Sequence, residues 1–414
     1  MSNTMPMGTR VKLSAMMFLQ FMMFAVFWAA LAPYVTNQGA GWASWKPWIL
    51  STMALGSLAS PLMGMFADRY FNGEKVLAVS NLICAAMLFM TARATTGLAV
   101  FVYLLIALLF YMPTWGLTAA IAMANSPAEQ FPQIRVFGTI GWVSSVLFGF
   151  VATKVFGTTI DGTTIPFYCG AGAAVVAALV ALLCPATPPK GKGQRFSAID
   201  ALGLRALSMM KDKNFAVFII VTLVAMIPFN IHFAFLGDFL TAKGFKQVTA
   251  VTYIGQAAEV FCMLLVTWAM RKFGVKWSII AGLVALTIRY VAYFFAAGDM
   301  TSLVYIGILI HGVIFGFFVV GGQVYVGKTA SADMQGQAQG FYALMAFGVG
   351  SFIGTFVNDA LIKFYTKPEV LEGGTTVLKG NWGSVWLVTL ACALACTLVM
   401  ALLFNPKPES GQEG

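Results

Sequence analysis

A single carboxylate, Glu259, lies near the middle of a long apolar stretch, Val248–Met270. About 20 apolar residues, in a helix that rises 1.5 Å per residue, cross the ~30 Å hydrocarbon layer of a membrane, which places Glu259 near the bilayer midplane. An acidic side chain there costs roughly 2.5 to 3.5 kcal/mol on insertion scales. We therefore expect a partner or a watery cavity beside it, and a role in moving a proton. A purely structural hydrogen bond between helices is the alternative.

The residues before Glu259 add further polar groups to the same helical face. Thr249, Thr252, Gln256 and Glu259 recur at the spacing of three and four residues that aligns side chains along a helix. Gln256 alone would satisfy a structural hydrogen bond. It is also a candidate ligand-binding residue, because an amide can hold hydroxyl groups.

A second polar face opens the apolar run at residues 132–156. Pro132 suits the first turn of a helix, and Arg135, Thr139 and Trp142 then share one side of it. This side offers a cation, a hydroxyl and a large ring. Alternatively, the long stem of Arg135 reaches the membrane surface, because the residue lies only about one turn from the expected start of the helix.

Four more side chains within apolar runs can bind or titrate. His311 is one of two histidines in the chain, and it can titrate near neutrality, bind a ligand or be purely structural. Asn230 offers an amide, and Phe315 offers an aromatic face that ordinary helix packing would also explain. Arg289 needs a partner, for which the acids of the second half of the chain, Glu259 among them, are candidates.

The elements that carry these residues are membrane helices. The chain has 414 residues, of which 59% are hydrophobic and 10% charged, as is typical of an all-α polytopic membrane protein. The net charge is +10, but the basic residues are scattered over loops instead of forming one patch, which argues against a nucleic-acid partner. Six cysteines without a Cys-x-x-Cys pair, and no Ser/His/Asp set or phosphate loop, predict no metal, no cofactor and no enzymatic activity.

Apolar runs bounded by charged or turn residues predict twelve transmembrane helices. Residues 1–184 form an N-terminal half of six spans, 185–213 a cytoplasmic linker, and 214–414 a C-terminal half of six spans with a short cytoplasmic tail. Lys and Arg are roughly twice as frequent on the side of the termini, which places both termini in the cytoplasm. The expected spans are 13–34, 47–67, 76–92, 98–123, 132–156, 166–184, 214–240, 248–270, 277–297, 302–327, 336–362 and 382–404.

Two halves of six spans resemble the parallel-repeat architecture of the major facilitator superfamily, in which the substrate lies between the halves near the membrane midplane. The loop after the second span, Gly64–Arg69, resembles the start of the Gly-x-x-x-Asp-Arg signature of that superfamily. Residues 271–274, after the eighth span, match the corresponding place in the second half more loosely.

Within that superfamily the chain resembles the nucleoside:proton symporters. The resemblance rests on Phe18–Phe21, Tyr111–Leu117, Phe131–Gly141 and Ala338–Gly340, of which the third is the most specific. It implies proton-coupled import of nucleosides by alternating access, across the bacterial inner membrane, by a multi-pass protein that we expect to be a monomer. It also implies that residues matching Arg135, Thr139, Gln256 and Glu259 lie in a central cavity, with Trp142 as an aromatic face and Asn230 as an amide.

The chain departs from this family in its tenth span. Members carry a tyrosine and an aspartate where this chain has His311 and Gly316. More of the proton coupling should then fall on Glu259, and we expect Glu259, Arg135 and His311 to be the proton-coupling residues. The predicted substrate-binding residues are Arg135, Thr139, Trp142, Asn230, Gln256, Glu259, His311 and Phe315.

Two other functions remain open at this level. Gly316 leaves room, and amides suit any polyol, so a proton-coupled transporter of sugars or small oligosaccharides is one alternative. A receptor or scaffold that transports nothing is the other.

Overall fold

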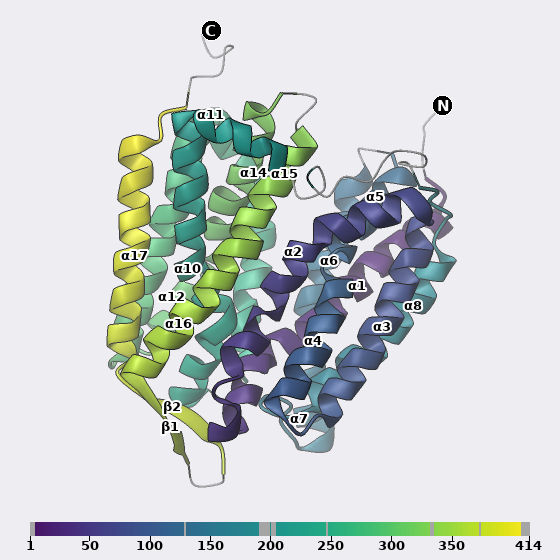
Figure 1. The fold of residues 1–414 in the computed structure, drawn as a ribbon. Coiled ribbons are helices and arrows are strands. Elements are labelled where there is room, and N and C mark those ends of the chain that lie inside the picture. Colours follow the sequence, from purple (N-terminus) through teal and green to yellow (C-terminus); the bar gives the residue numbers. More distant parts are fainter. Residues whose placement is uncertain are drawn as a thin grey trace.

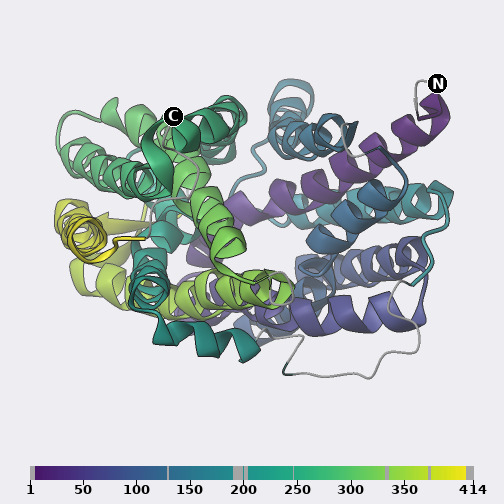
Figure 2. The same cartoon turned by 90° about the horizontal axis from the view of Figure 1, so that it is seen from above.

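The computed structural model describes residues 5–127, 130–189, 199, 204–245, 247–331, 335–371 and 374–406. It consists of two helical bundles that lie side by side, one from each half of the sequence (Figures 1 and 2). The first residues of α1 and the last residues of α17 lie at the same end of the molecule (Figure 1). The prediction of an all-α polytopic membrane protein is confirmed, with one small β-hairpin added.

The first bundle is interrupted where its sequence cannot continue a helix. The predicted fourth span breaks before Pro113, which lacks a backbone N–H, and the fifth breaks at Ser145, whose hydroxyl donates to the carbonyl of Trp142 at 2.7 Å. The elements are α1 (Met7–Asn37), η1 (Ala40–Trp42), α2 (Lys46–Tyr70), α3 (Gly73–Arg93), α4 (Gly97–Tyr111), α5 (Thr114–Ala124), α6 (Phe131–Ser144), α7 (Val146–Phe156) and α8 (Ile165–Leu183).

The second bundle contains two π-helical segments, η4 and η5, in its predicted tenth and eleventh spans. Such wide turns occur frequently at functional sites. The elements are η3 (Leu204–Lys211), α10 (Lys213–Ala242), α11 (Val248–Ala297), α12 (Leu303–Leu309), α13 (His311–Val313), η4 (Ile314–Val320), α14 (Gly321–Thr329), α15 (Gln335–Ala343), η5 (Leu344–Gly350), α16 (Ser351–Tyr365), β1 (Thr366–Val370), β2 (Thr376–Gly380) and α17 (Trp382–Leu403).

Ten helices among the described residues are long and apolar enough to cross a membrane. The expected spans at 47–67 and 248–270 are helical, within α2 and α11 respectively, but neither is one of the ten. The expected eighth and ninth spans join in α11, which breaks at Gly274 with φ 77°, a conformation that glycine adopts readily. The side chains of the Gly64–Arg69 motif and of Arg271, together with residues 190–198 and 200–203 of the expected linker, lie outside the described residues.

The hairpin of β1 and β2 lies at the end of the molecule opposite the termini (Figure 1), and we call this the hairpin end. Its strands pair in antiparallel register with Pro368 opposite Leu378. The backbone N–H of Thr376 donates to Asn37 Oδ1 at the end of α1, at 3.0 Å. The hairpin therefore joins the second bundle to the first.

Hydrogen bonds between the bundles gather at or near the hairpin end. Lys46 on α2 pairs with Asp238 on α10, with 2.5 Å between Nζ and Oδ2, and Thr36 donates to the other carboxylate oxygen at 2.7 Å. Thr249 at the start of α11 donates to Asp161 Oδ1 at 2.5 Å. Every hydrogen bond that joins the bundles within the described ranges lies at this end or within a few turns of it. The molecule is thus sealed on the hairpin side.

Candidate functional site

Glu259 faces His311 across a close contact between α11 and α13. Its Oε2 lies 3.7 Å from His311 Nε2. Two glycines allow this approach: a Cβ at Gly312 would lie 2.8 Å from the Glu259 Cα, and one at Gly255 would lie 2.5 Å from the Ile308 carbonyl oxygen. The partner expected for a midplane carboxylate is therefore present, and it is the histidine of the tenth span.

Arg289 lies fully buried on the far side of the His311 ring. Its Nε donates to the Gly307 carbonyl at 3.0 Å, and its Nη2 is 3.0 Å from His311 Nδ1. Direct pairing of Arg289 with Glu259, which the sequence left open, does not occur. The imidazole ring stands between the guanidinium and the carboxylate.

Arg135 approaches the same carboxylate from the first bundle. It lies on α6, and its Cζ is 4.6 Å from the centre of the Phe21 ring of α1, in cation–π contact. The charges of Arg135 and Glu259 are close enough to interact, although no ion pair joins them among the described residues. The two bundles therefore present opposite charges to each other at the level of Glu259.

Trp142 carries an aromatic contact from one bundle to the other. Its ring centre lies 5.5 Å from that of Phe24 on α1 and 6.0 Å from that of Tyr253 on α11. The indole N–H groups of Trp142 and Trp115 have no hydrogen-bond partner within the described residues, and both are shielded from solvent. The aromatic cluster of Trp142, Phe24 and Tyr253 is suited to contact a ligand that has a flat ring.

The remaining predicted residues divide into two groups. Thr139 and Gln256 make no side-chain hydrogen bond in the described part of the chain, and they lie on the same helices as Arg135 and Glu259. The Phe315 ring, in η4, lies 6.0 Å from that of His311. Asn230 is different, because its Oδ1 accepts a 3.3 Å bond from Thr355 on α16 and so faces that helix. The structure joins Phe315 to the site and directs Asn230 toward α16.

Sequence reasoning missed Phe21 and Tyr253 as site residues. Tyr253 precedes Gln256 by three residues, so its place on the polar face of α11 was available from spacing. Its hydroxyl donates to the carbonyl of Ala25 on α1, which ties the two bundles together just beyond Trp142. Phe21 follows Gln20 in a motif already noted, but nothing in its type distinguishes it from the other phenylalanines of the chain.

Asp161 in the loop between α7 and α8 is a further residue that sequence reasoning missed. Burial raises the pKa of its carboxyl, and the hydrogen bonds from the Thr249 hydroxyl and backbone N–H oppose that rise.

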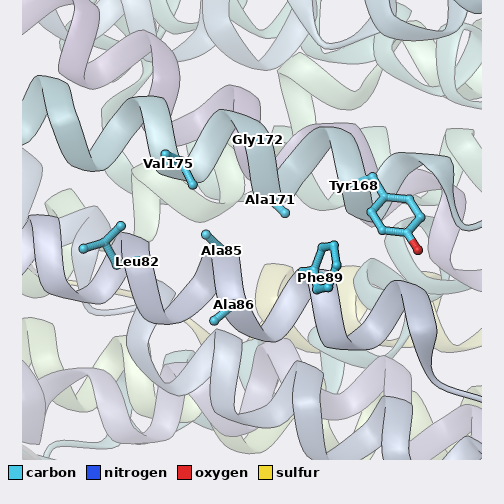
Figure 3. A pocket seen from close by; sticks show the side chains of 8 residues that line it. All are labelled: Leu82, Ala85, Ala86, Phe89, Tyr168, Ala171, Gly172 and Val175. Atoms are coloured by element: carbon cyan, nitrogen blue, oxygen red, sulfur yellow. The ribbon is translucent and has the colours of Figure 1, made fainter.

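A groove of about 430 Å³ on the outer face of α3 and α8 is distinct from this site (Figure 3). Its lining is apolar apart from the Tyr168 hydroxyl, and none of the predicted site residues contributes to it. A polar solute would find few partners there. The lining residues are Leu82, Ala85, Ala86, Phe89, Tyr168, Ala171, Gly172 and Val175.

Comparison with known proteins gives matches along nearly the whole chain. Residues 7–409 match the family model described as nucleoside H+ symporter. The chain is 34% identical over 406 residues to the putative nucleoside transporter YegT of Escherichia coli (strain K12), covering 96% of this chain and 94% of that protein. It is 26% identical over 426 residues to the xanthosine permease of the same strain, covering 97% and 98%. The crystal structure of nucleoside transporter NupG matches with a TM-score of 0.82 at 25% identity, over 97% of this chain and 100% of that one.

Proposed function

The chain belongs to the nucleoside H+ symporter family, and we propose that it imports nucleosides by alternating access with Glu259 as the group that carries the proton. The observation that carries this proposal is the position of Glu259, which faces His311 of its own bundle and the Arg135 charge of the other. Because Glu259 interacts with both bundles, its gain or loss of a proton can change how strongly the two bundles attract each other.

We assign proton coupling to Glu259, Arg135 and His311. For the substrate, Trp142 and Phe315 supply aromatic faces, and base–aromatic stacking contributes roughly 1 to 3 kcal/mol per base. Thr139 and Gln256 supply uncharged donors and acceptors for hydroxyl groups and base edges, and Asn230 supplies its amide N–H groups, since its Oδ1 accepts from Thr355. All of these residues belong to one chain, so a monomer contains the whole site.

We place the protein in the bacterial inner membrane with both termini in the cytoplasm, on the basis of the excess of Lys and Arg on that side. The hairpin end then faces outward. Because the bonds between the bundles gather there, the structure represents a state that is closed to the outside.

In this cycle Glu259 takes a proton from the outer side, and its neutral form permits closure around the nucleoside. Release of the proton on the inner side restores the anion, which the positive charge of Arg135 favours. One proton moving through 100 mV supplies roughly 2.3 kcal/mol, enough for about a fifty-fold gradient of a neutral solute.

The test is Glu259→Gln in proteoliposomes that take up radiolabelled uridine under an inward proton gradient. The variant should lose accumulation above the outside concentration, because an amide cannot release a proton. Exchange of labelled for unlabelled uridine should persist, because exchange needs no net proton movement.

Glu369→Gln is the matched control, since this exposed carboxylate belongs to the hairpin. Unlabelled nucleosides should compete with uridine for uptake, and maltose should not. Accumulation by Glu259→Gln that still follows the proton gradient would remove Glu259 from the mechanism.

A further inference from the structure

The contacts of Arg289 determine which nitrogen of His311 carries a proton. A guanidinium can only donate hydrogen bonds, so His311 Nδ1, 3.0 Å from Arg289 Nη2, must accept one. The single proton of a neutral imidazole is then on Nε2. That nitrogen is buried without a hydrogen-bond partner in the described part of the chain, and it lies 3.7 Å from Glu259 Oε2.

We propose that Arg289 is a positioning residue that holds His311 as the neutral Nε2–H tautomer, so that His311 donates to the Glu259 carboxylate without itself carrying the transported proton. The proposal rests on the function proposed above and refines it. It divides the proton-coupling residues into one carrier, Glu259, and one fixed donor, His311.

The groups around the ring disfavour a second proton on His311. A proton on Nδ1 would point at the Nη2 donor of Arg289 and remove the hydrogen bond between them. It would also place two cations side by side in a fully buried region. The titratable groups that face His311 are Glu259 and Arg289 on α11 and His232 on α10, and Tyr293 on α11 interacts with His232 and Arg289.

The distance of 3.7 Å suggests when this donor acts. It exceeds the usual range for a hydrogen bond, so in this state Nε2–H and the carboxyl are near neighbours without a formed bond. An ionised Glu259 attracts the N–H, and a shift of less than an ångström completes a charge-assisted bond. His311 thereby stabilises the anion at the step where Glu259 gives up its proton.

His232 provides an internal control of the same residue type and burial. Its ring stacks on that of His311 with centres 5.4 Å apart and planes at 17°. Its Nδ1 lies 3.0 Å from the Tyr293 hydroxyl, and it makes no contact with Glu259 among the described residues. A change at His232 therefore disturbs the packing of His311 while leaving the Arg289 and Glu259 contacts in place.

The first experiment is nitrogen NMR of the wild-type protein with ¹⁵N-labelled histidine rings, which is practical because the chain has two histidines. His232→Phe assigns the remaining signal to His311. We expect a protonated Nε2, a bare Nδ1 and no titration between about pH 5 and 8. A doubly protonated His311 within that range, or a proton on Nδ1, overturns the proposal.

The second experiment measures uridine uptake against external pH. His311→Phe should move the alkaline limb of the profile upward by about one pH unit and slow the maximal rate about tenfold, because the Glu259 anion loses its donor. Arg289→Gln should act in the same direction, because the shorter side chain no longer holds the His311 proton on Nε2. His311→Gln should keep the alkaline limb and the maximal rate close to those of the wild type, since its amide can accept from Arg289 and donate to Glu259. His232→Phe should leave the profile in place.

The outcomes separate the two levels of proposal. If the wild type accumulates no nucleoside, the proposed function fails, while the imidazole spectrum still tests the tautomer. If uptake depends on Glu259 but the profile of His311→Phe equals that of His232→Phe, the inference about His311 and Arg289 fails and the function stands. If Arg289→Gln does not fold, the uptake profiles of His311→Phe and His311→Gln, together with the wild-type NMR spectrum, still test the inference.

Discussion

Trp142, a proposed substrate-binding residue, also takes part in the contact between the bundles. Its ring packs against Phe24 of its own bundle and Tyr253 of the other, and its indole N–H has no partner among the described residues. A base stacked on the Trp142 ring would take the place of its contacts with Phe24 in one bundle and Tyr253 in the other. Recognition of the base and closure of the bundles then involve the same ring.

Trp142→Ala should raise the KM for uridine about tenfold, because one base–aromatic stack contributes roughly 1 to 3 kcal/mol. The maximal rate should change less, since Glu259 and His311 stay in place. Trp277→Ala is the control: this tryptophan is 59% exposed and lies on α11 just after the break at Gly274. Equal KM values for the two variants would show that Trp142 does not contact the base.

The residues that could be predicted from the sequence are those whose type is unusual in an apolar helix. Glu259, Gln256 and Arg135 stand out by polarity and spacing alone. The pairing of Arg289 with His311 could not be predicted, because it depends on how α11 and α13 pack against each other. Phe21 and Tyr253 could not be distinguished by residue type, because aromatic residues make up 14% of the chain.

At the scale of helices, close packing and breaks in the spans position the site. Gln20 on α1 donates to Asn81 Oδ1 at 3.1 Å and to Thr114 Oγ1 at 2.7 Å, while Tyr111 donates to the Gln20 carbonyl at 2.7 Å. These bonds tie α1 to α3 and to the break between α4 and α5. They give a physical reason why the two motifs noted around Gln20 and Tyr111 occur together.

Gly312→Ala should destabilise the protein by about 1 to 3 kcal/mol, the usual range for overpacking. Its new methyl group would meet backbone atoms of Ala258 and Glu259 at 2.8 Å, which forces α13 away from α11. Gly172→Ala on α8 is the control, because nothing lies within 4 Å of its added Cβ. Thermal unfolding in detergent measures both, and equal melting temperatures would contradict the tight contact.

The span positions were predictable, and their internal irregularities were not. Lengths of apolar sequence locate a membrane helix, so the expected spans overlap the observed helices along the chain. The π-helical segments η4 and η5 depend on contacts with neighbouring helices. The strands β1 and β2 have five residues each, too few for a periodic pattern to stand out from a polar loop.

At the scale of the whole molecule, the buried ion pair of Lys46 and Asp238 joins the two bundles at the hairpin end. The two side chains are 7% and 1% exposed, and they belong to different bundles. Removing one partner of a buried pair costs about 3 to 5 kcal/mol, because the other charge stays buried and unpaired. That cost falls on the closed state alone, since opening hydrates both groups.

Asp238→Asn should therefore shift the protein toward a state that is open at the hairpin end. Spin labels at Thr159→Cys and Lys367→Cys, exposed positions on the two bundles, should report a longer distance population. Glu369→Gln is the control, because its bond to Lys379 lies within the hairpin, with the two side chains 47% and 67% exposed. An unchanged distance distribution in Asp238→Asn would mean that the pair does not hold the bundles together.

The sealed hairpin end also makes the two mouths of the transporter unequal for a ligand in solution. A nucleoside on the side of the hairpin end can bind only those transporter molecules whose two bundles have separated at that end. If that fraction is about 1%, the affinity measured from that side is about a hundredfold weaker than the affinity of the binding pocket itself. Titrations carried out on right-side-out and inside-out vesicles should thus yield different half-saturation concentrations for one and the same set of contacts.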